Sequence, residues 1–125
     1  FDNRTVSCRV LGNSPGSLRA EWRVPGADAN PYLTVAAVLA SMNDGMATQA
    51  DPGPPTEGDA YQKANGTAFP PHLGLAADAF EASEFARTVF GTEVVQQYGI
   101  AARWEWQQFL GAVTDWELDR YYENV

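Results

Sequence analysis

The stretch from Leu18 to Leu33 constrains the fold more than any other part of this chain. Successive side chains of a strand point to opposite faces, so its first residues have an apolar side and a charged side. The apolar side comprises Leu18, Ala20, Trp22 and Val24, and the charged side comprises Arg19, Glu21 and Arg23. Pro25 and Gly26 break the strand, and Asn30 and Pro31 provide a helix N-cap and first turn. The sequence therefore predicts a strand, a turn and a buried helix.

The charged side of this strand admits two interpretations. In the first it is a solvated sheet surface, on which the Glu21 carboxylate is neutralised by the guanidinium groups beside it. In the second it binds an anionic, phosphorylated substrate, because arginine matches phosphate and carboxylate oxygens with two parallel hydrogen bonds. A single carboxylate among arginines can also hold a divalent metal that the same phosphate binds. The local pattern leaves both interpretations open.

The charges of the chain are unevenly distributed. The net charge of −8 argues against nucleic acid as a partner, because binding to a phosphate backbone needs a basic surface. Residues 1–30 nevertheless hold four of the eight basic side chains, all of them arginine, against three acidic ones. The N-terminal segment is therefore a locally positive region in an acidic chain.

Length and apolar content bound the architecture. A chain of 125 residues suits one domain with a modest core. No apolar run approaches the roughly 18 residues of a membrane span, so no membrane partner is expected. Cys8 is the single cysteine, which excludes an internal disulfide and favours a reduced, cytoplasmic setting. Because the chain opens at Phe1, directly before a predicted strand, we expect it to be a piece of something longer.

The N-terminal half is predicted to contain a hairpin, a helix and a loop. Residues 5–10 alternate and are followed by turn chemistry over 12–16, which indicates an antiparallel hairpin with the strand after Leu18. We expect the helix from Pro31 to about Met46 to be ended by Asn43, Asp44 and Gly45 and to pack beneath the hairpin's apolar side. The long, proline-rich loop over 47–71 is expected to pack on structure outside this chain.

The C-terminal half is predicted to be mostly helical, which makes the fold class α+β. Apolar spacing from Leu73 indicates two short helices or one kinked helix, ended by Gly91. A longer helix is expected from about Thr92 to Leu110. Thr114 and Glu117 form a capping box that starts a last helix.

Several conspicuous residues are assigned no chemistry. His72 stands at a helix entrance, where a surface or capping role is expected. The aromatic residues of the C-terminal half are expected to pack in the core rather than to stack on a ligand; they are Trp104, Trp106, Trp116, Tyr121 and Tyr122. The triplets that begin at Asn3 and Asn65 match the glycosylation pattern, and we interpret both as chance.

Three segments resemble the C-terminal catalytic region of glutamine synthetases. They are Asn3 to Thr5 followed by Arg9, the run from Arg19 to Leu33, and the tail from Val113 to Tyr121. The tail is similar to that of the family's amine and polyamine ligase branch, and the likeness covers the whole chain. It implies that residues 1–125 are a single domain, the C-terminal part of a glutamine-synthetase-like catalytic domain whose N-terminal part is absent.

The resemblance implies an ATP-dependent ligase that phosphorylates the glutamate side chain and joins it to ammonia or an amine. By the same likeness, Glu21 would hold a divalent ion, Mg²⁺ or Mn²⁺, beside the nucleotide phosphates. Arg23 would contact the transferred phosphoryl group, and Arg4 and Arg9 would contact substrate or nucleotide phosphate. Arg19 would lie by the nucleotide.

The resemblance also implies what lies outside the chain. The family's other metal ligands belong to segments before the position of Phe1, and its active sites borrow residues from a neighbouring subunit of a ring-shaped homo-oligomer. We therefore expect residues 1–125 to be inactive alone. Tyr61 stands where some bacterial members carry a regulatory adenylylated tyrosine, but the residues after it depart from that pattern, so regulation there is not expected. The alternative function is a non-catalytic structural or interaction module.

Overall fold

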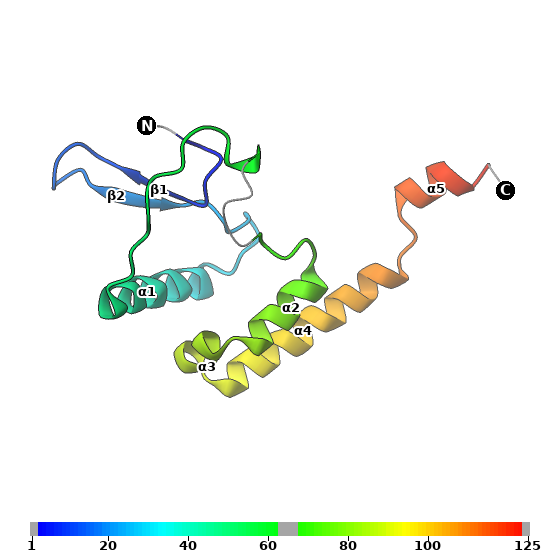
Figure 1. Cartoon of the computed structure of the whole chain (residues 1–125). Helices are drawn as coiled ribbons and strands as arrows, with labels where there is room; N and C mark the ends of the chain where they lie inside the picture. Colours follow the sequence, from blue (N-terminus) through cyan, green and yellow to red (C-terminus); the bar gives the residue numbers. More distant parts are fainter. Residues whose placement is uncertain (1–2, 63–67, 124–125) are drawn as a thin grey trace. The chain divides into compact units, whose positions relative to one another are not determined.

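The computed structural model describes residues 3–62 and 68–123, which fall into two compact units, one over residues 1–68 and one over 69–125. The first unit contains strands β1 (Cys8–Leu11) and β2 (Arg19–Trp22), helix α1 (Pro31–Thr48) and the short 3-10 helix η1 (Ala60–Gln62). The second contains helices α2 (Leu73–Ala82), α3 (Glu84–Phe90), α4 (Thr92–Gly111) and α5 (Asp115–Tyr121), as Figure 1 shows. The predicted α+β class, with one antiparallel hairpin and a helical C-terminal half, is confirmed.

The hairpin has the face pattern that the alternation predicts. The strands pair antiparallel with Arg9 opposite Glu21 and Val10 opposite Ala20, so the charged and apolar residues gather on different faces. At the tip, the Ser17 hydroxyl accepts hydrogen bonds from the backbone N–H groups of Asn13 and Ser14. The ladder is shorter than predicted, because the residues before Cys8 are bends rather than strand.

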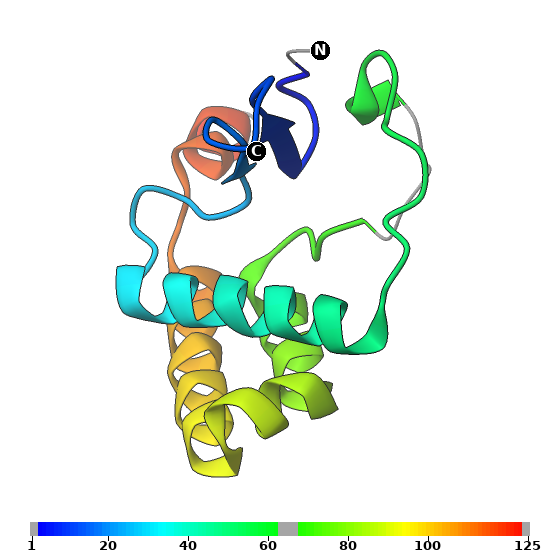
Figure 2. The ribbon, with the colours of Figure 1, turned by 90° about the vertical axis from the view of Figure 1, so that its left-hand side faces the viewer.

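Helix α1 begins as predicted and ends later. The Asn30 side chain caps it by accepting from the N–H groups of Tyr32 and Leu33, at 3.0 and 3.3 Å. The predicted end at Asn43 to Gly45 is wrong, since the helix continues without a break to Thr48 (Figure 2). A glycine inside a helix costs only about 1 kcal/mol, which the flanking helical residues tolerate. The helix ends instead at Gln49, whose φ of 52° places it in the left-handed region.

The expected burial of α1 beneath the hairpin is not observed. No α1 residue is buried, and Tyr32 at its start is 85% exposed. The hairpin's apolar side is also open, with Val10 and Trp22 both exposed, and α1 makes no extensive contact with either strand. The apolar composition of α1 correctly indicates a helix, but composition does not specify which surface covers it.

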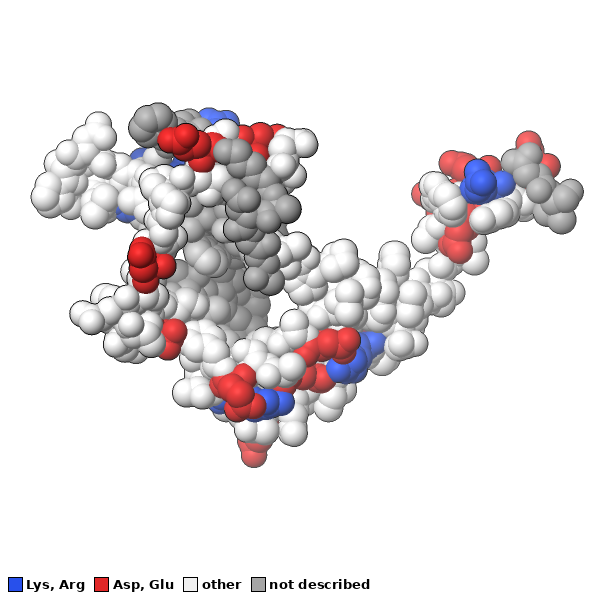
Figure 3. Space-filling model, viewed as in Figure 1, with Lys and Arg blue, Asp and Glu red and all other residues white. Residues whose placement is uncertain are grey.

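The second unit is built around small side chains. Helices α2 and α3 both pack on α4 (Figure 1), and the buried apolar residues among those described are Ala77, Ala86 and Val95. Arg103 of α4 reaches across to α2, where it pairs with Asp78 at 2.7 Å and with Glu81. Figure 3 shows acidic and basic atoms adjoining on the surface of these helices. Small residues therefore let the helices approach closely, and ion pairs bridge their exposed edges.

The predicted starts and ends of these helices are confirmed. Helices α2 and α3 are separate, and the Ser83 hydroxyl between them caps α3 by accepting from the Ala86 N–H at 3.1 Å. Gly91, with φ of 84°, separates α3 from α4. At α5, the Glu117 N–H donates to the Thr114 hydroxyl and the Thr114 N–H donates back to the Glu117 carboxylate. Local capping chemistry thus sets the boundaries in this unit.

His72 has the capping role expected of it, whereas most of the aromatic residues do not form a core. The His72 Nδ1 accepts from the Leu75 N–H at 3.3 Å, and its ring stacks on Trp106 with centroids 4.5 Å apart. The expectation of core packing is wrong for Trp104, Trp116, Tyr121 and Tyr122, which are all exposed. Trp116, at 65% exposure, contacts Tyr121 and Arg120 of the same helix. A seven-residue helix offers too little surface to bury such rings.

Two helical glycines are expected to respond in opposite directions to replacement by alanine. A Cβ on Gly74 would lie 2.7 Å from the Trp106 Nε1, so the stacked ring must shift. A Cβ on Gly45 meets nothing within 4 Å. Gly74→Ala should therefore lower the free energy of unfolding by about 1–3 kcal/mol, and Gly45→Ala should raise it by up to about 1 kcal/mol. Urea denaturation of the two variants measures both. A Gly74→Ala variant as stable as wild type or more stable would contradict the packing described at Gly74, and a destabilised Gly45→Ala variant would contradict the open space described at Gly45.

Among the described residues, no helix is both long enough and apolar enough to span a bilayer.

Candidate functional site

The structure brings three of the predicted site residues together on the hairpin. Arg9 on β1 lies directly opposite Glu21 on β2, and its Nη2 donates to the Glu21 Oε2 at 2.7 Å. Arg23, just beyond β2, donates through Nη1 to the other carboxylate oxygen, Oε1, at 2.5 Å. The cross-strand register sets the first contact and the two-residue repeat of the strand sets the second. We call Arg9, Glu21 and Arg23 the arginine–glutamate cluster.

One member of the cluster, Arg9, is more buried than the arginine of an ordinary surface ion pair. The Arg9 side chain is only 13% exposed, and that of Glu21 is 37% exposed. The hydrogen bond from Arg9, followed by that from Arg23, holds the pKa of the Glu21 carboxyl below its ordinary value. Glu21 therefore stays ionised at pH values at which an unperturbed glutamate begins to protonate.

The other two predicted arginines are Arg19 and Arg4. Arg19 lies on the same hairpin face as Glu21, but its Nη1 donates to the Ser17 carbonyl at 3.4 Å. Arg4 is exposed in the bend that precedes β1. The sequence pattern groups all four arginines, whereas the hydrogen bonds to Glu21 described above come from Arg9 and Arg23.

The cluster can supply one ligand to a metal ion, the Glu21 carboxylate. Each Glu21 oxygen accepts one hydrogen bond from an arginine, and a carboxylate oxygen has a second lone pair that remains open to a cation. Over residues 3–62 and 68–123, no group of three histidine, cysteine or acidic side chains is placed to hold a metal. Glu21 thus suits Mg²⁺ bound through one carboxylate, water and substrate phosphate, a common arrangement for that ion.

Two residues of the segment that resembles the family, Asn3 and Thr5, were given no role of their own from the sequence. Their triplet was interpreted as a chance glycosylation match, yet both side chains hydrogen-bond to the loop between α1 and α2. An asparagine two residues before a threonine is a pattern that favours a side-chain turn, and that signal could have identified them. The second triplet, at Asn65, lies outside the described residues.

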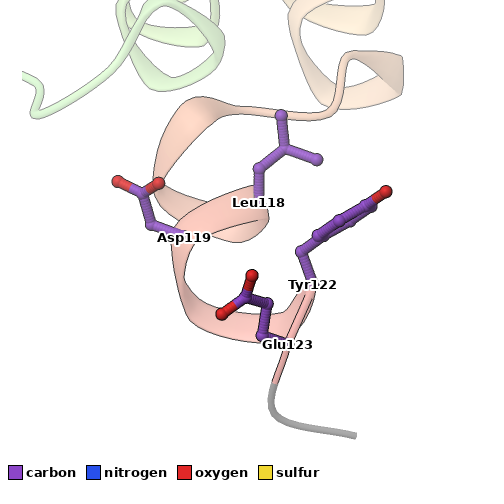
Figure 4. Close-up of a pocket in the computed structure, with 4 residues that line it drawn as sticks. All are labelled: Leu118, Asp119, Tyr122 and Glu123. Carbon is purple, nitrogen blue, oxygen red and sulfur yellow. The ribbon is translucent and has the colours of Figure 1, made fainter.

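A hollow beside α5 is not a candidate for the catalytic site. It is lined by Leu118, Asp119, Tyr122 and Glu123 (Figure 4). In this view the Asp119 carboxylate points away from Leu118 and Tyr122, so the polar groups do not converge on one point. The hollow therefore offers no arrangement suited to catalysis.

Comparison with known proteins identifies the family of the chain. The family model described as "Glutamine synthetase, catalytic domain" matches residues 1–121. The chain is 42% identical to a glutamate–isopropylamine ligase of Pseudomonas, over 100% of this chain and 28% of the relative. It is 44% identical to a gamma-glutamylethanolamide synthetase of Streptomyces coelicolor, over 99% of this chain and 26% of the relative. A glutamine synthetase of Halobacterium salinarum is 37% identical, over 98% of this chain and 28% of the relative.

The chain thus spans between a quarter and a third of the length of these curated relatives. The family match covers both units, from the arginine–glutamate cluster to the capped helix α5. On this evidence, the chain belongs to the glutamine synthetase catalytic-domain family.

Proposed function

We propose that residues 1–125 form the C-terminal part of an ATP-dependent ligase that phosphorylates the side-chain carboxylate of glutamate and joins it to ammonia or an amine. Membership of the family supports the reaction class. The names of the relatives, which include glutamate–amine ligases and glutamine synthetases, support glutamate as one substrate. Residues 1–125 then contribute one wall of an active site that is completed by segments preceding Phe1.

The observation that carries this proposal is the Glu21 carboxylate held between Arg9 and Arg23. A phosphoryl group in transfer carries negative charge on several oxygens, and catalysis consists mainly of positioning and neutralising that charge. Guanidinium groups supply planar pairs of N–H donors for this purpose. The ionised carboxylate between them is suited to a divalent cation.

The five predicted site residues then divide the work of binding and neutralisation. Arg23 contacts the transferred phosphoryl group and Arg4 contacts the substrate. Arg9 and Arg19 bind nucleotide phosphate, and Glu21 is a ligand of Mg²⁺ or Mn²⁺. When bound, that ion supplies charge neutralisation at the phosphate oxygens. Arg9 has a second role, because its hydrogen bond to Oε2 orients the Glu21 carboxylate.

An amine other than ammonia is the favoured acceptor. Two of the relatives described above are named for isopropylamine and ethanolamide chemistry, and their identities of 42% and 44% exceed the 37% of the glutamine synthetase. The full-length protein is proposed to be a ring-shaped homo-oligomer that acts on small molecules in the cytoplasm.

A non-catalytic member of the family is the second candidate function. It is favoured by the fact that the Glu21 carboxylate already has both oxygens bonded to arginine, which a purely structural cross-strand cluster would also show. A structural cluster tolerates replacement by another well-paired set, whereas a catalytic one does not. The two candidates therefore differ in whether the full-length protein turns over ATP.

Turnover of ATP by the full-length protein, and none by the isolated chain, is the expected result. The full-length protein should release phosphate only when glutamate and an amine are both supplied. Residues 1–125 alone should release none, because one carboxylate leaves most of the metal's oxygen shell to water. A coupled phosphate assay with each substrate omitted in turn measures this. Phosphate release by the isolated chain would contradict the proposal that residues 1–125 supply only part of the active site. A full-length protein that is inactive with ammonia and with a panel of amines would favour the non-catalytic candidate.

A further inference from the structure

The loop between α1 and α2 is joined to the N-terminal segment at Asn3 and Thr5. The Asn3 Nδ2 donates to the carbonyl oxygens of Thr56 and Gly58, at 3.3 and 2.9 Å. The Thr5 hydroxyl accepts from the Ala60 N–H at 2.8 Å. Figure 1 shows this loop leaving α1 and returning toward the start of the chain. These contacts bridge more than fifty residues of sequence and lie within one compact unit.

The hydrogen bonds at Asn3 use the full capacity of its amide. The Oδ1 accepts from the Thr5 N–H at 3.0 Å and from the Thr5 hydroxyl at 2.7 Å, while the two Nδ2 hydrogens go to the loop carbonyls. The direction of the Thr5 hydroxyl is also determined. It must accept from Ala60, because a backbone N–H can only donate, and so its own proton is directed to Asn3.

Arg4 lies inside the turn that these bonds close. The bond from the Thr5 N–H to the Asn3 Oδ1 forms a ring that includes the Arg4 backbone, and the loop is bonded to the residues on both sides of it. The side chains of Asn3 and Thr5 are both partly buried, whereas Arg4 is exposed. A long side chain on a fixed backbone searches fewer positions than one on a free segment, and alignment of the binding group is a large part of catalysis.

We infer that Asn3 and Thr5 are positioning residues, which dock loop residues 56–60 and thereby hold Arg4 in place for its substrate. The inference rests on the proposed function, since Arg4 has a substrate to contact only there. It goes further by assigning the loop a role in the active site. Residues 56–60 support the backbone on both sides of Arg4 through three side-chain hydrogen bonds.

Hydrogen exchange of the Ala60 amide tests the docking itself. Thr5→Val removes the acceptor for this N–H and keeps the side-chain shape, so the amide should exchange at least about tenfold faster. Thr5→Ser retains the hydroxyl and should preserve the protection. Asn3→Asp places an acceptor against the two loop carbonyls and should also speed exchange. The control is Asn13→Asp at the hairpin tip, which makes the same chemical change away from the loop. Unchanged Ala60 protection in both Thr5→Val and Asn3→Asp would overturn the inference.

Steady-state kinetics of the full-length protein test whether the docking acts through Arg4. Arg4→Gln should lower kcat/KM by about 10²-fold, and Thr5→Val by about tenfold, with Thr5→Ser within about twofold of wild type. In the Arg4→Gln background, Thr5→Val should lower kcat/KM by less than about a further twofold, because the guanidinium group that Thr5 positions is already gone. Independent effects that multiply would show a merely structural role and overturn the inference.

The outcomes separate this inference from the proposed function. Suppose that the wild type is active and that Arg4→Gln impairs it. If Thr5→Val and Asn3→Asp then speed exchange of the Ala60 amide but keep full activity, only the positioning role is refuted. If Arg4→Gln is fully active, the assignment of Arg4 itself is refuted, and the positioning role with it. Circular dichroism establishes that each variant folds, and Asn3→Asp replaces Thr5→Val in the cycle if the latter does not.

Discussion

Arg23→Lys is expected to lower kcat of the full-length ligase by about 10²-fold, with a smaller change in KM, if Arg23 contacts the phosphoryl group mainly in the transition state. Lysine keeps the positive charge but loses the planar pair of N–H donors. It also loses the geometry of the 2.5 Å contact with the Glu21 Oε1, so the carboxylate is less well oriented. Steady-state kinetics at saturating and limiting ATP separate the two parameters.

The matched control for this substitution is Arg87→Lys. Arg87 also donates to a glutamate, Glu84 on α3, at 2.6 Å, but it lies in the second unit and has no role in the proposed site. Arg87 donates in addition to the Glu81 carbonyl, which also lies in the second unit, so its replacement should leave kcat within about twofold of wild type. An Arg23→Lys enzyme that folds and turns over as fast as the control would refute the contact between Arg23 and the phosphoryl group.

Glu21→Gln is expected to raise the Mg²⁺ concentration needed for half-maximal activity and to lower turnover by about 10²-fold at saturating metal. Both oxygens of Glu21 accept from arginine, at 2.7 Å from Arg9 and 2.5 Å from Arg23. A glutamine must present its NH₂ group to one of these guanidiniums, which are themselves only donors. The variant therefore loses both the anion that binds the metal and one of the bonds that orient it.

Titration of activity with Mg²⁺ measures this effect directly. Glu84→Gln is the control, since it makes the same substitution in an exposed ion pair on α3. The metal requirement of the control should match that of wild type. If Glu21→Gln lowers turnover without changing the metal requirement, Glu21 acts by orienting the arginines and the proposed metal ligand lies elsewhere.

The features predicted correctly from the sequence are those determined within a few residues. The two faces of β2 follow from alternation, and the start of α5 follows from the spacing of Thr114 and Glu117. The predicted end of α1 was wrong because it relied on Gly45 as a local stop signal. The helical residues on both sides of Gly45 override that signal. The burial of side chains was the least predictable property. An apolar pattern shows that one face of a helix can be covered, but it does not show which part of the protein covers it.

The candidate site could be predicted only as a set of residue types. Alternation places Glu21 and Arg23 on one face, but the pairing of Arg9 with Glu21 depends on register, which the turn between the strands sets. Arg19 shares the face and still bonds elsewhere. The bonds from Asn3 to the loop carbonyls join positions that no local periodicity relates. Long-range contacts of this kind depend on how the loop folds back.

The exposed surface of α1 has a consequence for how the chain behaves as a solute. Its exposed apolar residues recur at alternating steps of three and four, the period of a coiled-coil seam; they are Tyr32, Val35, Leu39, Met42 and Met46. A stripe with this period matches a second copy of itself, and self-association that involves the folded chain stabilises it by mass action. The unfolding free energy of the isolated chain should therefore be compared between variants only at one protein concentration. In a chain that remains single, the first unit is held by its hairpin, its loop contacts and its capped helix.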